Sequence, residues 1–257
     1  MLPSSADTVL NGSYQVQIFD TPVLFLRNGG LSTEQQIVKR TFDIVFSGLG
    51  ILITAPLMLI IAVLIKCTSR GPVIFKQQRV TLNGKIFNIY KFRSMTDDRD
   101  ENGNLLPDEV RLTKFGKWLR NTSLDEIPEA INILKGDMSV LGPRPLLVKD
   151  YVFFDEETLK RQSVRPGLSG LAQVNGRNNI SWEDKFKYDL QYIKKISLWK
   201  DIGLVFKTIG KAFVKQENID REGFATDEDY GDYLLRTNKI TQAEYDAGIE
   251  RAKHYGK

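Results

Sequence analysis

Two adjacent acids, Asp125 and Glu126, are the residues best suited to chemistry in this sequence. Ser123 with Glu126 three residues later matches a capping box, and Pro128 favours a first helical turn, so a helix entry is predicted here. At a helix entry the dipole keeps a carboxylate ionised and attracts anions. An ionised aspartate beside cations is a competent nucleophile toward phosphorus, and a neighbouring glutamate suits Mg²⁺. Taken locally, Glu126 as a helix cap and Asp125 as a solvated first-turn acid explain the same pattern.

Basic residues lie on both sides of this acidic pair. A predicted basic stripe precedes it, with cations every three residues at Arg111, Lys114, Lys117 and Arg120. Further upstream, Lys91 and Arg93 belong to the segment YKFRSM. Downstream, two rigid turns each present one guanidinium, in Pro143-Arg144-Pro145 and in Asn175-Gly176-Arg177. Such cations often lie on solvated faces or in loop connectors. The alternative is a site for phosphate or lipid headgroups.

Composition narrows the kinds of chemistry that the chain can perform. The 257 residues include one cysteine and one histidine. An internal disulfide is therefore impossible, and neither thiolate metal sites, zinc sites nor histidine catalysis is expected. Lys and Arg total 36 against 32 acids, a net charge of +4 that suits a nucleotide, nucleic acid or phospholipid without choosing among them. Carboxylates, cations and backbone groups must carry the function.

One apolar segment, residues 44–65, stands apart from the rest of the chain. As a helix it would reach about 33 Å, enough to cross a bilayer core of about 30 Å. Its flanks carry Lys39 and Arg40 before it and Lys66 and Arg70 after it. Because positive flanks favour the cytoplasmic side, both ends are predicted to face the same side.

Pro56 lies near the middle of this segment and interrupts helix hydrogen bonding. Each half of the segment is about ten residues, or roughly 15 Å, which is one leaflet deep. A re-entrant helix that bends at Ala55-Pro56 and returns fits this length, the positive flanks and the proline together. Asp43 is placed to pair with Lys39 or Arg40 at helical spacing. The alternative is an ordinary kinked transmembrane helix, because proline is common in those.

The remaining pattern predicts an α+β, predominantly helical fold. Residues 73–75 and 86–90 flank Asn83-Gly84, which predicts a β-hairpin with a two-residue turn. A loop is predicted over residues 96–107. Helices are predicted over residues 110–135, 181–196 and 200–215, with Ser181 as an N-cap. The helix over 200–215 is amphipathic and basic, which suits either a membrane surface or core packing. The expected division is an extension over 1–36, a membrane hairpin over 37–70, a catalytic domain over 71–215 and an accessory tail over 216–257.

In combination, these features resemble the bacterial sugar transferase family, the monotopic polyprenyl-phosphate phosphoglycosyl transferases. The matching stretches occur in the family's order and cover about residues 37–213: KRTFD at 39–43, the bent segment through Pro56, KFRSM at 91–95, TSLDEIP at 122–128, LGPRP at 141–145, RPG at 165–167 and QVNGR at 173–177. The family's usual serine before the proline of the bend is Ala55 here, which removes a hydroxyl at that point.

The resemblance implies transfer of a sugar 1-phosphate from a UDP-sugar to undecaprenyl phosphate, with release of UMP. It implies that Asp125 is the nucleophile that forms a covalent phosphosugar intermediate. It also implies that Glu126 binds Mg²⁺, with Asp125 as a second ligand. It implies phosphate binding by Arg120 and Arg177 and places Lys91 and Arg93 in a motif near the site. It assigns Pro143, Arg144 and Pro145 to the uridine side of the donor. Lys39, Arg40, Asp43 and Pro56 match the segment that sets membrane topology. The implied location is the bacterial inner membrane, with the catalytic domain on the cytoplasmic face.

The expected partners are the UDP-sugar, undecaprenyl phosphate and membrane phospholipid, with a homodimer or downstream glycosyltransferases as further candidates and no nucleic acid. Two rivals stay open at this point. One is a non-enzymatic membrane anchor that binds lipid or a partner, and the other is a single-span enzyme that uses a different donor such as a CDP-linked alcohol. The transferred sugar, the oligomeric state and the destination glycan are not specified by any motif.

Overall fold

The computed structural model describes residues 14–18, 21–25, 31–176, 180–213 and 228–256. Short strands and 3-10 turns connect a mainly helical chain, which confirms the α+β, predominantly helical class. The strands form two-stranded sheets: β1 (Tyr14–Ile18) with β2 (Thr21–Phe25), β3 (Ile74–Val80) with β4 (Ile86–Phe92), and β5 (Ser139–Leu141) with β6 (Gly167–Ser169). The first two pairs are antiparallel and the last is parallel.

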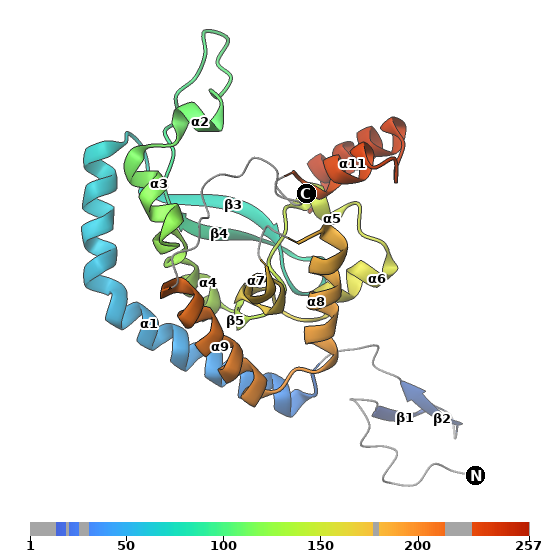
Figure 1. Ribbon diagram of the computed structural model, residues 1–257. Helices are drawn as coiled ribbons and strands as arrows, with labels where there is room; N and C mark the ends of the chain where they lie inside the picture. The colour runs from blue at the N-terminus through green and yellow to red at the C-terminus, as the bar shows by residue number, and fades with distance from the viewer. Residues whose placement is uncertain (1–13, 19–20, 26–30, 177–179, 214–227, 257) are drawn as a thin grey trace.

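The helices follow in chain order around these small sheets (Figure 1). They are α1 (Thr33–Thr68), α2 (Asp108–Arg111), α3 (Lys114–Asn121), α4 (Glu129–Lys135), α5 (Val148–Tyr151), α6 (Glu156–Leu159), α7 (Leu171–Asn175), α8 (Trp182–Lys194), α9 (Leu198–Phe213), α10 (Tyr230–Arg236) and α11 (Gln242–His254). The 3-10 turns are η2 (Leu82–Gly84), η3 (Leu124–Glu126) and η4 (Lys160–Ser163).

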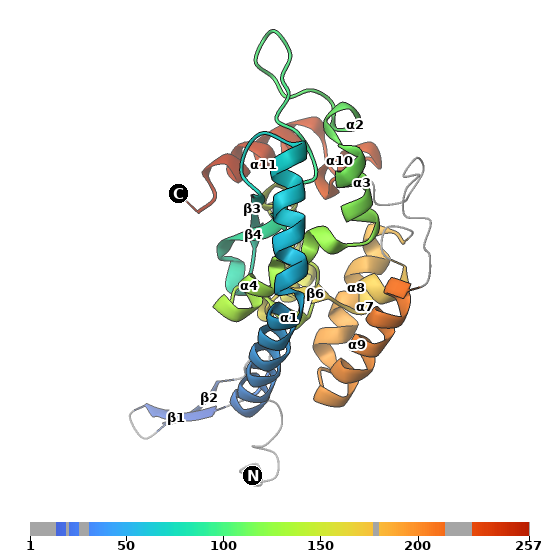
Figure 2. The same cartoon turned by 90° about the vertical axis from the view of Figure 1, so that its left-hand side faces the viewer.

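Helix α1 is one continuous helix that begins before the predicted boundary at residue 37. Ser32 caps it through a capping box with Gln35. The ribbon changes direction along its length in both views (Figures 1 and 2). Pro56 lies inside the helix, and the Thr54 hydroxyl donates to the carbonyl of Gly50 at 2.7 Å. A proline and a back-bonding threonine both bend helices. Re-entry into a membrane stays a prediction.

Most of the apolar side chains on α1 are exposed. Leu52 and Ile53 are 72% and 76% exposed. By length and composition α1 is the helix of the described chain that is able to cross a membrane, and 11% of its most apolar window is buried inside the protein. A core helix of a water-soluble domain would bury such residues, so this apolar surface suits a lipid environment.

The N-terminal part of α1 is bound to β5, α4, α8 and α9 through three polar side chains. Lys39 donates to Asp201 at 2.7 Å and to the Tyr192 hydroxyl at 3.0 Å. Arg40 donates to two carbonyls at the end of α4. Asp43 accepts from the Ser139 hydroxyl and the Val140 amide, both at 2.9 Å. Among the described residues no salt bridge joins Asp43 to Lys39 or Arg40, although both positive charges act on its carboxylate. Groups from β5, α8, α9 and α4 make the direct contacts with these three side chains.

The predicted hairpin is present as β3 and β4, with strands longer than expected. Asn83 and Gly84 have φ of 58° and 74°, the positive values expected for this dipeptide. The connection is longer than two residues, because Val80 pairs with Ile86 and η2 lies between them. One face of β4 enters the main core, which consists of Phe87, Ile89, Ile133, Met138, Val140, Leu141, Val174, Tyr192 and Leu204.

The C-terminal part of the chain continues the helical architecture. Ser181 caps α8 by accepting from the Asp184 amide at 3.1 Å, as predicted. Helix α9 confirms the helix expected over 200–215, and its Leu204 is buried while Phe206 is exposed. The predicted accessory tail contains α10 and α11, here called the C-terminal helical pair, which pack on α5 (Figure 1).

Candidate active site

One cavity of about 430 Å³ gathers side chains from several parts of the fold. Strand β4 and the segment after it bring Lys91, Arg93 and Ser94, and the end of α3 brings Arg120. The turn η3 contributes Asp125 and Glu126. The loop after β5 contributes Arg144. Residues separated by more than fifty positions in sequence therefore line the same space.

The backbone around the acidic pair differs from the predicted capping box. Ser123 has φ 55° and makes no side-chain capping bond, so the capping box is absent. Asp125 and Glu126 lie on the 3-10 turn η3, and α4 begins after Pro128. The left-handed backbone at Ser123 starts a tight turn instead of a long helix. The two carboxylates therefore come from a tight turn between α3 and α4.

Two cations bind the carboxylate of Glu126. Lys91 Nζ lies 2.7 Å from Glu126 Oε1, and Arg144 Nη2 lies 3.0 Å from the same oxygen. Burial alone would raise the pKa of Glu126, but the charges of Lys91 and Arg144, with the hydrogen bonds they donate, keep it well below its usual range. Glu126 is therefore ionised across the physiological pH range.

Asp125 is buried, with 8% of its surface exposed. Burial first, and then the negative charge of Glu126, raises the pKa of Asp125. The positive charges of Lys91, Arg120 and Arg144 oppose that rise. A partly desolvated carboxylate beside cations is a stronger nucleophile than a fully hydrated one.

A third carboxylate, Glu129, lies behind Lys91. Its Oε1 is 3.2 Å from Lys91 Nζ, and the side chain is almost fully buried. Burial and the charge of Glu126 raise the pKa of Glu129 to about 7. Lys91 thus lies between one carboxylate that stays ionised and one that titrates near neutral pH.

The guanidiniums at the cavity wall are fixed by neighbouring polar groups. Arg120 Nε donates to the Ser94 hydroxyl at 2.8 Å. Arg93 forms an ion pair with Asp97 at 2.7 Å and also donates to the carbonyl of Arg70. Fixed forks of this kind match the oxygens of phosphate groups. The wall around the acidic pair is therefore suited to an anionic ligand.

Several predicted site residues lie together, and others do not. Among the residues that the structure describes, the cavity is lined by Lys91, Arg93, Arg120, Asp125, Glu126 and Arg144. Pro143 and Pro145 flank Arg144 without lining it. Arg177 lies outside the described residues. The basic stripe divides, because Arg111 and Arg120 line the cavity while Lys114 and Lys117 are exposed elsewhere on α3.

Arg79 is a cavity residue that the sequence reasoning missed. It lies on β3 and donates to Gln77 at 2.7 Å and to the carbonyl of Pro145 at 3.2 Å, both neutral groups. Its Nε is buried and has no hydrogen-bond partner among the described residues. Burial, with the like charge of Arg144, lowers the pKa of Arg79 to about 10, so the side chain remains charged at neutral pH. No motif marked Arg79, because an isolated arginine in a strand is not distinctive.

The donor set fits one common mode of Mg²⁺ binding. Within the described chain, no group of three or more His, Cys, Asp or Glu side chains is arranged to hold a metal ion by itself. Mg²⁺ usually takes one or two carboxylates and completes its shell with water and substrate phosphate. Asp125 and Glu126 line one cavity, and only Oε1 of Glu126 is bound by Lys91 and Arg144. These two carboxylates therefore suit a metal shared with a phosphate ligand.

Comparison with known proteins shows which family this chain is similar to. Residues 34–215 match the family described as bacterial sugar transferase. The uncharacterized sugar transferase EpsL of Bacillus subtilis is 45% identical over 180 residues, which are 70% of this chain and 89% of that protein. The UDP-glucose:undecaprenyl-phosphate glucose-1-phosphate transferase of Klebsiella pneumoniae is 39% identical over 217 residues, which are 80% of this chain and 45% of that protein.

A third relative is the undecaprenyl-phosphate galactose phosphotransferase of Salmonella typhimurium. It is 36% identical over 228 residues, which are 81% of this chain and 48% of that protein. The chain thus spans less than half the length of these two named enzymes. The family match covers the helix α1, the cavity and all of its predicted residues. The resemblance seen in the sequence is confirmed, and the chain belongs to the bacterial sugar transferase family.

Proposed function

We propose that this chain transfers a sugar 1-phosphate from a UDP-sugar to undecaprenyl phosphate and releases UMP. The observation that carries the proposal is the burial of Asp125 in a cavity lined by Lys91, Arg120 and Arg144. An anionic diphosphate suits such a wall, and a buried carboxylate suits attack on phosphorus. Relatives named for transfer between the same substrate classes support the choice of donor and acceptor.

In the first step, an oxygen of Asp125 attacks the phosphorus that bears the sugar. The new Asp125–phosphorus bond forms while the bond from that phosphorus to the bridging oxygen breaks. UMP leaves with the bridging oxygen and its electron pair. Arg120 and Lys91 lie where they can neutralise charge on the oxygens of the transferred phosphate, which is the main requirement of phosphoryl transfer. Arg144 lies where it can bind the donor.

In the second step, a phosphate oxygen of undecaprenyl phosphate attacks the same phosphorus. The bond from phosphorus to Asp125 breaks, the carboxylate is regenerated, and the product is an undecaprenyl diphosphate sugar. Splitting the transfer in this way lets a water-soluble donor and a lipid acceptor use one site in turn. Mg²⁺ shared between Asp125, Glu126 and a donor phosphate would neutralise charge on that phosphate.

The proposed location follows from α1 and its flanks. We propose that α1 enters the inner membrane and returns at its bend, with the cavity on the cytoplasmic side. Both ends of the apolar segment carry cations, and the helix exposes its apolar side chains. The cytoplasmic face is where a UDP-sugar is available to a membrane enzyme.

Cysteine labelling tests this topology. In a Cys67→Ser background, Glu34→Cys and Ser69→Cys place single thiols at the two ends of α1. A membrane-impermeant thiol reagent on intact cells should label neither position until the cells are permeabilised. Labelling of one end alone would establish a spanning helix, and labelling of both would place the domain outside.

The enzymatic proposal is tested with a panel of UDP-sugars, undecaprenyl phosphate and Mg²⁺, assayed for UMP. We expect UMP release with one or a few UDP-sugars and a strict requirement for Asp125. Release of CMP from a CDP-linked donor would instead support a different donor class. Lipid binding with no nucleotide release from any donor would contradict the transferase.

A further inference from the structure

The loop that carries Arg144 is fixed by hydrogen bonds from three directions. Arg161 Nη2 donates to the carbonyl of Arg144 at 3.1 Å. Arg79 donates to the carbonyl of Pro145 at 3.2 Å. At the end of the loop, the Leu147 amide donates to Asp150 Oδ2 at 3.3 Å. Because Arg144 binds Glu126 and lines the cavity, the position of this loop determines part of the active-site geometry.

Asp150 also contacts a part of the chain that lies outside the family match. Its other oxygen, Oδ1, accepts from the Tyr230 amide at 2.9 Å. Tyr230 is the first residue of α10, whereas the family match ends at residue 215. Asp150 is 3% exposed, so both hydrogen bonds are shielded from water. One buried carboxylate therefore connects the Arg144 loop to the C-terminal helical pair.

The C-terminal helical pair packs tightly against the residues that follow α5. The Phe153 ring lies against both helices, stacked on Tyr245 with ring centroids 5.9 Å apart. A Cβ added at Gly248 would lie 2.3 Å from this ring, and one added at Gly231 would lie 2.6 Å from it. Both glycines are buried. Any larger side chain at either position must displace the ring or the helix.

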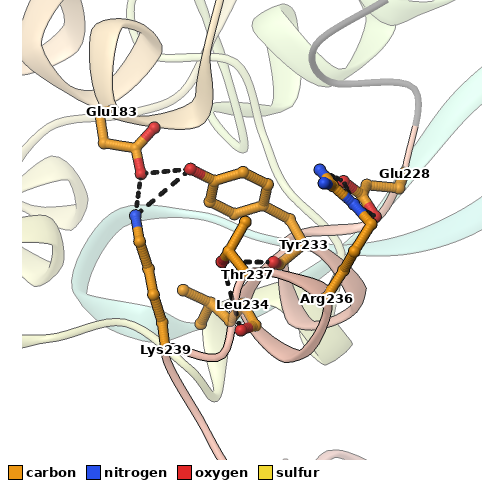
Figure 3. Close-up of polar contacts among 7 residues, drawn as sticks. All are labelled: Glu183, Glu228, Tyr233, Leu234, Arg236, Thr237 and Lys239. Atoms are coloured by element: carbon orange, nitrogen blue, oxygen red, sulfur yellow. Dashed lines mark hydrogen bonds and ion pairs between the residues drawn. The ribbon is translucent and has the colours of Figure 1, made fainter. Parts of the chain in front are cut away.

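A second set of contacts binds the helical pair to α8. Figure 3 shows Lys239 and the Tyr233 hydroxyl converging on the Glu183 carboxylate, and Arg236 pairing with Glu228. On the other side, the Tyr255 hydroxyl donates to the carbonyl of Gly84 at 2.9 Å. The pair is therefore attached to the β3–β4 turn, to α5 and to α8 at once.

We propose that the C-terminal helical pair acts through Asp150 to position Arg144, so that its docking sets the affinity for the UDP-sugar. Asp150 is a positioning residue in this scheme, because it touches the loop and not the substrate. The inference rests on the proposed function. It assigns a role to residues 228–256, which lie outside the catalytic motifs.

The expected effect falls on donor binding more than on chemistry. A buried hydrogen bond is worth about 1 kcal/mol, which converts to about fivefold in affinity. Among the described residues, the hydrogen bonds of Asp150 go to Leu147 and Tyr230 and none goes to Asp125. Loss of the connection should therefore raise KM for the UDP-sugar by about fivefold while kcat and KM for undecaprenyl phosphate stay near wild type.

The main test compares Gly248→Val with Gly203→Val in the full chain. Both changes put a β-branched residue into a helix, but a Cβ at Gly203 meets nothing within 4 Å. Gly248→Val should raise donor KM about fivefold, and Gly203→Val should leave it unchanged. Adding Phe153→Ala to Gly248→Val removes the ring that the valine meets, and should return donor KM toward wild type.

Asp150→Asn is the second test and does not depend on moving α11. The asparagine keeps the shape of the side chain but presents an NH₂ group to one of the two amide donors. It should raise donor KM in the same way as Gly248→Val. Wild-type donor KM in both Gly248→Val and Asp150→Asn would overturn the inference. A fall in kcat together with an equal rise in KM for both substrates, without rescue by Phe153→Ala, would also overturn it, since that is the effect of general misfolding.

The control for the proposed function is the wild-type chain in the same assay. If wild type releases no UMP from any UDP-sugar, the proposed function fails and this inference fails with it. If wild type is active and the two variants keep its donor KM, only the inference fails.

Discussion

Lys91 Nζ lies 2.7 Å from Glu126 and 3.2 Å from Glu129, so one ammonium connects two buried or half-buried carboxylates. The pKa of Glu126 is held low by this ammonium and by Arg144, whereas burial raises the pKa of Glu129. The arrangement keeps a negative charge next to Asp125 and places behind Lys91 a carboxyl that titrates near neutral pH. It makes Lys91 central to the electrostatics of the cavity.

Lys91→Met should reduce kcat for UMP release by about a hundredfold, because losing one fixed donor that stabilises charge in the transition state costs about 10²- to 10³-fold in kcat. Glu126 would then keep Arg144 as its remaining cation. Lys117→Met is the matched control, since Lys117 is exposed on α3 and does not line the cavity. Wild-type kcat in Lys91→Met would show that the pair has no part in catalysis.

Arg79→Gln should raise KM for the UDP-sugar by about 10- to 100-fold, the range for losing a hydrogen bond to a charged group. The guanidinium lines the cavity and has neutral hydrogen-bond partners, so it is available to an anionic ligand. Steady-state kinetics over a range of donor concentrations measures the effect. Arg99→Gln, on the exposed loop before α2, is the control. An unchanged donor KM in Arg79→Gln would remove Arg79 from donor binding.

Glu129 predicts a pH-dependent contribution to stability. In the unfolded chain its carboxyl has a pKa near 4.5, and in the folded chain about 7. Between these values the unfolded state has released a proton that the folded state retains, so stability falls as pH rises. The loss is about 3.5 kcal/mol at most, because each pKa unit corresponds to about 1.4 kcal/mol.

Glu129→Gln should remove this part of the pH dependence. Thermal unfolding in detergent between pH 4.5 and 8 should show a smaller fall in Tm for Glu129→Gln than for wild type. Glu156→Gln, at an exposed position on α6, should follow the wild-type curve. Parallel curves for Glu129→Gln and wild type would contradict the raised pKa of Glu129.

Short-range signals in the sequence predicted several elements correctly. Asn83-Gly84 identified the β3–β4 turn, and Ser181 identified the start of α8, because each depends on backbone chemistry within a few residues. The motifs around residues 91, 120, 125 and 144 also identified side chains that line one cavity. In these cases local preference and tertiary structure agree.

Contacts that depend on tertiary partners could not be predicted from the local sequence. The capping box at Ser123 is absent because the backbone there is left-handed and leads into η3. Asp43 binds β5 instead of its helical neighbours, since the Ser139 hydroxyl and Val140 amide lie within 2.9 Å. Arg79 and Asp150 carry no motif, and their partners are distant in sequence. Such contacts arise only when the chain has folded.

The covalent intermediate at Asp125 is the central claim, and mass spectrometry of the peptide that contains this residue tests it directly. The protein is incubated with its UDP-sugar and Mg²⁺ without undecaprenyl phosphate, and UMP is measured in the same sample. We predict a sugar-phosphate adduct on Asp125 with about one UMP released per chain, as expected for a covalent mechanism. Asp125→Asn should give neither, while Asp184→Asn, an exposed aspartate on α8, should match wild type. UMP release by Asp125→Asn at the wild-type rate, or an adduct on another residue, would contradict the assignment of Asp125 as the nucleophile.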